Sequence, residues 1–364
     1  MKIIKTLALF GVAVSLLLST SVFAKVHSGI EVTLKPHHQT LGNDQNIYVD
    51  VKVKNRTGGS VKVLKWFLPD DMGEIEDDLF KVTLNGKPVD YLGRHYKRPA
   101  PTDGDYVIFK KNEMRHYRVE LSGVYDFTEQ GQYEVVLNVR SYNLFSPSMA
   151  IQKADSNTAF TQLKSNSAVT IYVDKMRTAK RCNPRKEDCS GGGGTDDVSF
   201  TGACSNSEQN SIMSALSSAK TMANDSVSYL NGSAGPRYDT WFGSYSSSRW
   251  NTVASNFDAV KDALDNKPKT FDCSCNQSYY AYVYPSQPYK VYLCRAFWNA
   301  PTTGTDSKAG TIIHELSHFN VVAGTDDIVY GQTGAQNLAN SNPNQAVQNA
   351  DSHEYFAENT PYQN

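Results

Sequence analysis

The sequence predicts a chain of two domains, a β-sandwich followed by a mainly helical α+β domain. Apolar and polar residues alternate in short runs from residue 29 to residue 173, and helical periodicity replaces that alternation after about residue 200. A stretch ending in four glycines separates the part with alternating residues from the part with helical periodicity. A length of 364 residues also suits two domains. We therefore expect domains at residues 25–174 and 199–364, joined by a linker at 175–198.

The first 24 residues have the features of a signal peptide. Lys2 and Lys5 precede an apolar run from Leu7 to Leu18, and a site with small residues ends at Ala24. The run is too short for a comfortable membrane span, and no other segment of the sequence approaches one. We expect a Sec-type signal peptide of bacterial form over residues 1–24, secretion to the extracellular medium, and no membrane association of the mature protein.

Six alternating runs predict the strands of the sandwich. They are residues 47–54, 61–66, 80–84, 117–121, 133–139 and 169–173. Tyr133, in GQYEVVL, resembles the corner tyrosine of immunoglobulin-like sandwiches, so we expect an all-β, immunoglobulin-like domain. No group of residues in this domain looks catalytic. His37 and His38 are adjacent and would point to opposite sides of a strand, which favours a surface position over a metal site.

The linker is basic before it becomes rich in glycine. Residues 25–174 carry 19 basic and 19 acidic side chains, whereas residues 25–194 have a net charge of +4 and the chain from residue 195 onward has −7. A basic stretch could bind nucleic acid, but a processing site is the better account in an exported chain. We expect no nucleic-acid partner and cleavage within the linker.

Helical signals begin at residue 205. Ser205 and Glu208 form a capping box, and apolar residues at helical spacing follow from Ile212 to Ala223. A second helix is predicted from Trp250 to Leu264, and a third from residue 310 to Ala323, where Gly324 would stop it. Short strands come between them, and we expect residues 281–284 to align a peptide by backbone hydrogen bonds.

The third of these helices carries the pattern HELSH at residues 314–318. His314 and His318 are four residues apart, so both side chains project from one face and can bind one cation, with Glu315 beside them. A catalytic zinc ion takes three protein ligands and one water molecule. Zinc lowers the pKa of that water to about 7, and Glu315 could take its proton.

The sequence after the motif limits the third ligand. Metzincin spacing would need glycine at 321 and histidine at 324, where Val321 and Gly324 stand. The spacing disfavours a thermolysin-like glutamate, because no glutamate occurs between Glu315 and Glu354. A turn after Gly324 could return a carboxylate to the metal. Two candidates remain, and they are Asp326 and Asp327.

HExxH followed by GTxDxxYG resembles the signature of the aspzincins, the family of deuterolysins and peptidyl-Lys metalloendopeptidases. The likeness extends to CSNSEQ, YDTWFGSYSSSR, FDCSC, AYVYP, VYLCRAFWNAPTTGTDS and NADSHEYFAENTP, and covers about residues 200–364. The resemblance implies a zincin catalytic domain that binds one Zn²⁺ and hydrolyses proteins and peptides. It assigns His314, His318 and Asp327 as ligands, Glu315 as general base and Tyr330 as the hydroxyl that stabilises the oxyanion.

Asp351 and Glu354 are three residues apart and would share one face of a helix opened by Asn342 and Pro343. On an exposed helix they would form a solvated acidic patch. If they line the pocket beyond the metal, they require a cation there, which a lysine ammonium would supply. The resemblance to the peptidyl-Lys branch favours lysine on the C-terminal side of the scissile bond (P1′). His353 faces elsewhere on such a helix, which suggests a structural residue.

All six cysteines follow the signal peptide, as expected for an oxidising destination. Spacing alone leaves three connectivities for the four cysteines of the second domain, and the family resemblance suggests Cys204 with Cys273 and Cys275 with Cys294. The remaining two, Cys182 and Cys189, would then close a small loop in the linker.

These inferences combine into one expectation. The sandwich would be a propeptide that inhibits its own protease domain, and cleavage in the linker would release the enzyme. Two alternatives stay open, namely a deuterolysin-like protease of broad specificity and a secreted binding protein whose zinc is structural. A structural zinc would have four protein ligands, whereas the motif supplies three.

Overall fold

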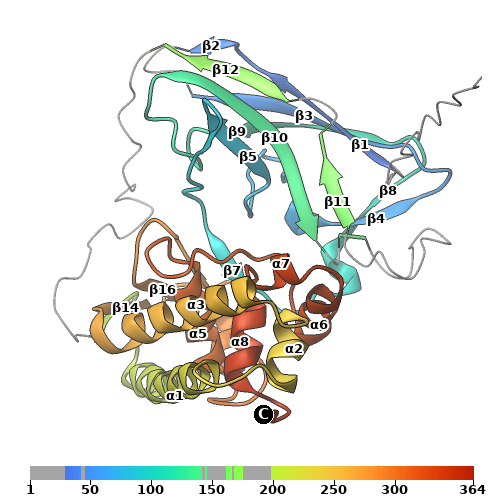
Figure 1. The fold of residues 1–364 in the computed structure, drawn as a ribbon. Helices are drawn as coiled ribbons and strands as arrows, with labels where there is room; N and C mark the ends of the chain where they lie inside the picture. The colour runs from blue at the N-terminus through green and yellow to red at the C-terminus, as the bar shows by residue number, and fades with distance from the viewer. Residues whose placement is uncertain (1–28, 42–45, 142–143, 146–160, 166–167, 175–197) are drawn as a thin grey trace, which may run out of the picture.

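A computed structural model describes residues 29–41, 46–141, 144–145, 161–165, 168–174 and 198–364. The chain forms a strand-rich N-terminal region and a mainly helical C-terminal region, as predicted (Figure 1). The predicted signal peptide lies outside the described residues, as does the predicted linker apart from Val198. Within the described part of the chain, no helix is both long and apolar enough for a membrane span.

Two sheets form most of the N-terminal region. The first has the order β1-β3-β9 and consists of β1 (Ile30–Pro36), β3 (Tyr48–Asn55) and β9 (Met114–Glu120). The second has the order β2-β12-β10-β5-β6, with strands β2 (Thr40–Leu41), β12 (Val169–Val173), β10 (Gly131–Ser141), β5 (Phe80–Leu84) and β6 (Lys87–Pro88), and β11 (Thr161–Lys164) also pairs with β10. A separate pair joins β4 (Val61–Leu64) to β8 (Tyr106–Phe109), and 3₁₀ turns span Lys65–Phe67 and Asp103–Asp105.

Each predicted strand run overlaps an observed strand, because alternating burial follows the alternating sequence. Val49, Val51 and Val53 of β3 are buried in one core with the inward residues of the second sheet. The Tyr133 hydroxyl donates a hydrogen bond of 2.8 Å to the carbonyl oxygen of Glu129, the bond expected of a tyrosine corner. The immunoglobulin likeness itself stays a prediction.

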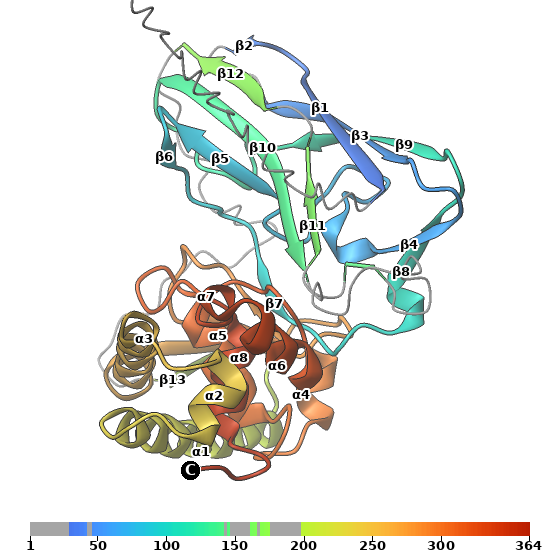
Figure 2. The same cartoon turned by 45° about the vertical axis from the view of Figure 1, so that its right-hand side comes forward.

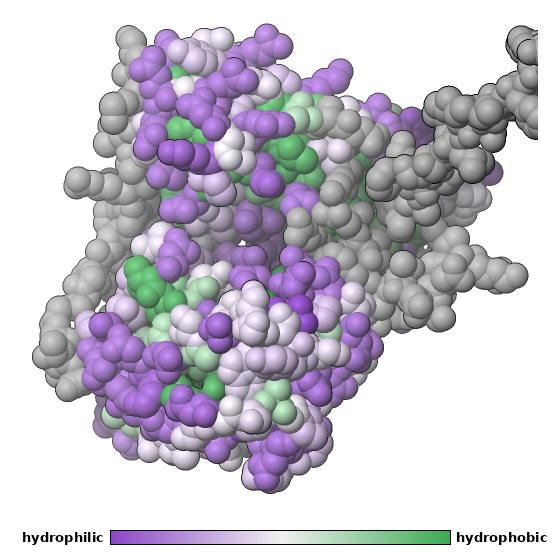
Figure 3. Space-filling model, viewed as in Figure 1, coloured by the Kyte–Doolittle hydropathy of each residue, from purple (hydrophilic) through white to green (hydrophobic). Residues whose placement is uncertain are grey.

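The C-terminal region has a second core, enclosed mainly by helices. The long helix α1 (Asn206–Leu230) begins with the predicted capping box of Ser205 and Glu208, and it packs against α3 (Ser247–Asn266), α5 (Lys308–His318) and α8 (Ala350–Glu358). The remaining helices are α2 (Pro236–Phe242), α4 (Arg295–Asn299), α6 (Gln332–Ser341) and α7 (Pro343–Ala346). Most buried apolar residues belong to one of the two cores, and the face in Figure 3 is mainly hydrophilic with small hydrophobic groups.

The sheet of the C-terminal region includes a strand from the N-terminal region. Its order is β13-β14-β16-β15-β7, with β13 (Val198–Thr201), β14 (Lys269–Asp272), β16 (Lys290–Leu293), β15 (Ala281–Val283) and β7 (His95–Lys97). The chain descends from the N-terminal sheets to place β7 among the C-terminal helices and then returns (Figures 1 and 2). The two regions are therefore joined by strand pairing as well as by covalent connection.

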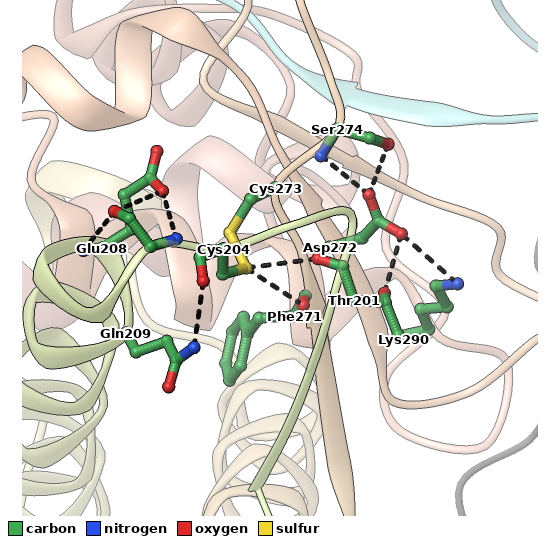
Figure 4. Close-up of a disulfide and its surroundings, with 10 residues drawn as sticks. Thr201, Cys204, Glu208, Gln209, Phe271, Asp272, Cys273, Ser274 and Lys290 are labelled. Carbon is green, nitrogen blue, oxygen red and sulfur yellow. Dashed lines mark hydrogen bonds and ion pairs between the residues drawn. A yellow bond between two sulfur atoms is a disulfide. The ribbon is translucent and has the colours of Figure 1, made fainter.

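Both disulfides suggested for the C-terminal region are present, Cys204 with Cys273 and Cys275 with Cys294. The first joins the start of α1 to the end of β14, and Asp272 next to it accepts a hydrogen bond of 2.7 Å from Thr201 Oγ1 (Figure 4). The bridges thus fix the strands that flank the site described below. Cys182 and Cys189 lie outside the described residues.

Two predicted helix boundaries are wrong. The third predicted helix, α5, ends at His318 and does not reach Ala323. Phe319 adopts an extended backbone, with φ −60° and ψ 132°, and its buried ring joins the core outside the helix. The amide of Thr325 donates a hydrogen bond of 3.1 Å to the carbonyl oxygen of Ser317, so the chain turns back beside the last helical turn.

The predicted helix opened by Asn342 and Pro343 is also divided. It stops at Ala346, and Asp351 and Glu354 lie on the separate helix α8. The interruption occurs at Asn349, whose backbone is extended and whose side-chain oxygen accepts hydrogen bonds of 3.1 and 3.0 Å from the amides of residues 328 and 329. This cross-connection ties α8 to the segment that follows α5.

Candidate active site

The site is built on α5, which is buried from Ala309 to His318. Ser307 caps its N-terminus by accepting a hydrogen bond of 2.9 Å from the amide of Gly310. Apolar side chains of α5 anchor it in the core, and His314, Glu315 and His318 lie together with 1% exposure or less. A helix fixed on all sides is a rigid support for catalytic side chains.

The turn after α5 returns Asp327 to the two histidines, as the family resemblance implied. Asp327 Oδ1 lies 3.2 Å from His314 Nε2, and Asp327 Oδ2 lies 3.4 Å from His318 Nε2. The turn is held by Ser317 and Thr325, whose hydroxyls are 2.6 Å apart. Asp326, the other candidate, instead uses its backbone to bond the segment before α8, through Gln348 O and Ala350 N.

These three side chains fit a zinc ion. Among the described residues, His314 Nε2, His318 Nε2 and Asp327 Oδ1 are buried atoms without a hydrogen-bond partner. Two ligands at 2.0–2.1 Å from a tetrahedral ion stand about 3.3 Å apart, which matches the separations of the nitrogen and oxygen atoms here. Imidazole nitrogens with one carboxylate are also a donor set that zinc prefers.

A second layer of contacts orients both histidines. His318 Nδ1 donates a hydrogen bond of 2.7 Å to the carbonyl oxygen of Thr325, which leaves Nε2 free for a metal. His314 Nδ1 lies 3.1 Å from Asp351 Oδ1 and 3.1 Å from Glu354 Oε2. Burial opposes ionisation of Asp327, but His318 and His314 hold the pKa of its carboxyl well below the usual range. Asp351 and Glu354 thus lie against His314, a contact that the sequence analysis missed.

Glu315 lies at the same centre with one free oxygen. Its Oε1 accepts a hydrogen bond of 3.1 Å from the amide of Lys97, and Oε2 has no partner among the described residues. Burial raises the pKa of Glu315 to about 7. A carboxylate with a pKa near neutrality can both accept and release a proton.

Tyr330 lies at the boundary between the two regions. It is buried and packs edge-on against Trp66 of the N-terminal region, with 5.3 Å between ring centroids. Burial, with Asp327 nearby, raises the pKa of the Tyr330 phenol well above its usual value. The hydroxyl therefore keeps its proton and can act only as a neutral donor or acceptor.

Asp351 and Glu354 form a buried acidic pocket that already contains a cation. Lys97 Nζ lies 3.1 Å from Asp351 Oδ1, 2.9 Å from Glu354 Oε2 and 3.1 Å from Asp306 Oδ1. Burial disfavours a charged lysine, but Asp351 and Glu354 raise the pKa of Lys97 well above its usual value. The acid pair is therefore not a solvated surface patch. It belongs with Asp306 to a site for an ammonium group, and we call these three residues the lysine pocket.

The backbone before Lys97 continues through the site. The amide of Tyr96 donates a hydrogen bond of 2.9 Å to Asp327 Oδ2, and the ring of His95 lies 4.8 Å from that of His318. Sequence reasoning found no catalytic group in the N-terminal region and so missed His95 and Lys97. Asp306 was also missed, although it lies in the TGTDS segment that resembles the family.

Comparison with known proteins finds peptidases among the relatives of this chain. Residues 228–358 match the sequence model of an aspzincin family described as lysine-specific metallo-endopeptidase. The chain is 46% identical to an "Extracellular protease" of Aeromonas hydrophila over 331 residues, which cover 89% of this chain and 91% of that protein. It is 54% identical to a "Peptidyl-Lys metalloendopeptidase" of Pleurotus ostreatus over 167 residues, 45% of this chain and 98% of that one.

Among solved structures, a zinc peptidase from Grifola frondosa matches with 49% identity and a TM-score of 0.42, covering 44% of this chain and all of that one. The long alignment with the Aeromonas protein shows the family. The chain belongs to the aspzincin family of lysine-specific metallo-endopeptidases and is a zinc-dependent metalloendopeptidase.

Proposed function

We propose that this chain is the precursor of a secreted metalloendopeptidase that cleaves peptide bonds on the amino side of lysine. The observation that carries the proposal is the lysine pocket. Three carboxylates converge on one ammonium group beside Glu315, whose Oε1 is 3.1 Å from the backbone nitrogen of that same lysine. A substrate lysine held in this way would present the bond before it to the catalytic residues.

His314, His318 and Asp327 would hold the zinc ion in this enzyme. Zinc supplies a Lewis acid that polarises a carbonyl group and makes a water molecule acidic. Glu315 would take a proton from the attacking water and deliver it to the leaving nitrogen of lysine, which is the atom that its carboxylate contacts in the precursor. Tyr330, kept as a neutral phenol, would donate a hydrogen bond to the developing oxyanion.

Specificity would follow from charge and burial in the lysine pocket. Asp351 and Glu354 are fully buried. If an apolar substrate side chain entered the pocket in place of lysine, these two carboxylates would have no counter-charge. Tyr280 and Tyr355 place their rings 5.6 and 5.1 Å from the ammonium and restrict the width of the site. Lysine satisfies both conditions.

The precursor organisation follows the sequence analysis. We propose a signal peptide at 1–24, an inhibitory propeptide at 25–174, a processing linker at 175–198 and the enzyme at 199–364. The two disulfides and the similarity to an extracellular protease support secretion. Substrates would be proteins and peptides outside the cell, with the propeptide as the intramolecular inhibitor.

A protein digest analysed by mass spectrometry tests lysine selection. The expected result is that new N-termini are overwhelmingly lysine. New N-termini spread over many residue types would instead support the deuterolysin-like alternative of broad specificity.

Asp306→Asn sharpens this test, because Asp306 contacts the lysine ammonium but is not among the residues within ion-pair distance of His314. We expect about tenfold lower kcat/KM for lysine-containing peptides, the effect of weakening one charged contact, with the zinc content unchanged. The matched control is Asp258→Asn, which removes an exposed carboxylate from α3. Equal kcat/KM for the two variants would argue against Asp306 as a specificity residue.

A further inference from the structure

Residues Arg94–Arg98, which we call the inserted segment, are bound in the active site side chain by side chain. Arg94 Nε donates a hydrogen bond of 2.6 Å to the hydroxyl of Tyr284, and Lys97 occupies the lysine pocket. Arg98 is buried and lies 4.7 Å from the ring of Tyr279. The segment thus contacts tyrosines before and after β15 as well as the lysine pocket.

The backbone of the inserted segment is bound as a strand added to the edge of the catalytic sheet. β7 pairs antiparallel with β15, in the register Ala281 with Lys97, Tyr282 with Tyr96 and Val283 with His95. The amide of Tyr280 also donates a hydrogen bond of 3.0 Å to the carbonyl oxygen of Lys97. β15 is the strand predicted to align a peptide substrate, and strand addition is a general mode of peptide binding.

This arrangement places one peptide bond, Tyr96–Lys97, next to the catalytic groups. The amide nitrogen of Lys97 is 3.1 Å from Glu315, and that of Tyr96 is 2.9 Å from Asp327. Because this bond lies on the amino side of a lysine, it is one that the proposed enzyme would cleave. The precursor therefore needs a feature that protects the Tyr96–Lys97 bond.

The imidazole of His95, next to this bond in the sequence, has a buried nitrogen whose role the contacts above do not explain. It is 5% exposed, and its Nδ1 is buried with no hydrogen-bond partner among the described residues. Leaving a buried polar atom unpaired destabilises the folded chain, so this nitrogen is expected to have a partner. One donor atom each from His95, His318 and Asp327 lie within 4.8 Å of one another, close enough to share a metal ion.

We propose that the inserted segment is a substrate-like inhibitor and that His95 is a fourth protein ligand of the zinc ion in the precursor. Three histidines and one aspartate make a closed four-coordinate site, whereas an active zinc hydrolase keeps one position for water. His95 would take that position. The inference rests on the proposed function, because it uses the same three ligands and the same lysine pocket.

The fourth ligand explains why Tyr96–Lys97 stays intact. Hydrolysis needs a water whose hydroxyl adds to the carbonyl carbon of Tyr96 and whose hydrogen passes to the nitrogen of Lys97 as the C–N bond breaks. His95 excludes that water, so the segment binds as a substrate without being cut. Removing the imidazole opens the position while Lys97 still holds the segment in place.

Cobalt substitution tests the ligand directly, without an activity assay. Full-length chain carrying Glu315→Ala, which prevents self-cleavage, is loaded with Co²⁺, and proton NMR counts the exchangeable imidazole signals shifted by the metal. We expect three signals, two after His95→Gln, and three after the control His116→Gln, which changes an exposed histidine of β9. Two signals with and without His95 would overturn the inference and leave the proposed ligands standing. No shifted signals in any sample would overturn both.

The full-length chain with Glu315 intact gives a second readout, the mass of its fragments. The His95→Gln chain should cleave its own Tyr96–Lys97 bond, which gives a fragment with Lys97 at its N-terminus. The double variant His95→Gln and Glu315→Ala should not cleave this bond. If the His95→Gln chain stays intact at this bond while the matured natural enzyme cleaves added lysine peptides, His95 is not what protects the bond. If the matured natural enzyme cleaves no lysine peptide either, the proposed function fails as well.

Discussion

His353 is held neutral in the core beside the lysine pocket. Its Nδ1 donates a hydrogen bond of 3.0 Å to the carbonyl oxygen of Asn349, and Nε2 accepts one of 3.0 Å from the side chain of Asn256. The ring packs between Phe242 and Phe257, so His353 is structural, as its position in the sequence suggested. Burial lowers the pKa of His353 to about 4.

The lowered pKa predicts a loss of stability in acid. The unfolded chain binds a proton at His353 near pH 6.5, and the folded chain does so only near pH 4. The contribution of this residue is therefore fully present above pH 6.5 and is lost as the pH falls through 4, a change of about 3 kcal/mol. Urea unfolding from pH 7 to 4 at saturating zinc should show a shallower decline for His353→Gln than for the natural chain. Parallel declines would contradict the assignment, and His116→Gln is the exposed control.

The contact between α5 and α8 holds His314 and His318 next to the lysine pocket, and it depends on Gly310. A Cβ atom added there would lie 2.2 Å from Glu358 Oε1 and 3.0 Å from Glu354 Cγ. Glu358 cannot easily move, because its carboxylate accepts hydrogen bonds of 2.7 Å from both the amide and the hydroxyl of Ser307. The two helices can approach this closely only because residue 310 lacks a side chain.

Gly310→Ala should therefore destabilise the C-terminal region although alanine favours helices. The gain in helix propensity is about 1 kcal/mol, and overpacking costs about 1–3 kcal/mol before the Ser307 bonds are lost. We expect a net loss of about 2 kcal/mol and a lower Tm in a thermal melt. Gly59→Ala is the control, since a Cβ there meets nothing within 4 Å. A Tm equal to or above that of the natural chain would contradict tight packing at Gly310.

Features of the helices and strands that depend on residues close together in the sequence were predicted. Features that depend on contacts between distant residues were not. Alternation predicted the strands, and the capping box of Ser205 marked the start of α1. The apolar spacing through Phe319 predicted a helix that is too long, because a buried ring fits the core equally well from an extended segment. Asn349 breaks the next predicted helix through bonds to a loop some twenty residues away, which periodicity does not report.

Residues from both the N-terminal and the C-terminal region meet at the candidate active site. The proposed ligands and Glu315 lie within 14 residues of sequence, so one helix and one turn bring them together, and their proximity could be predicted. His95 and Lys97 are more than 200 residues away and lie in a region whose pattern indicates only strands. Their proposed role depends on the pairing of β7 with β15, which joins the strand-rich region to the mainly helical one.

The pairing of β7 with β15 leads to a prediction about how the precursor is cleaved to the mature enzyme. While Lys97 fills the lysine pocket, a molecule cannot bind its own linker lysines, such as Lys175, Lys180 and Lys186, in that site. Self-processing must then occur between molecules, with an active enzyme cutting the linker of an intact precursor. The natural chain should mature faster at higher concentration, and Glu315→Ala should mature only after a trace of active enzyme is added, at the same bond. N-terminal sequencing over time checks both points. Unaided maturation of Glu315→Ala at that bond, as fast as the natural chain, would show that another protease does the processing.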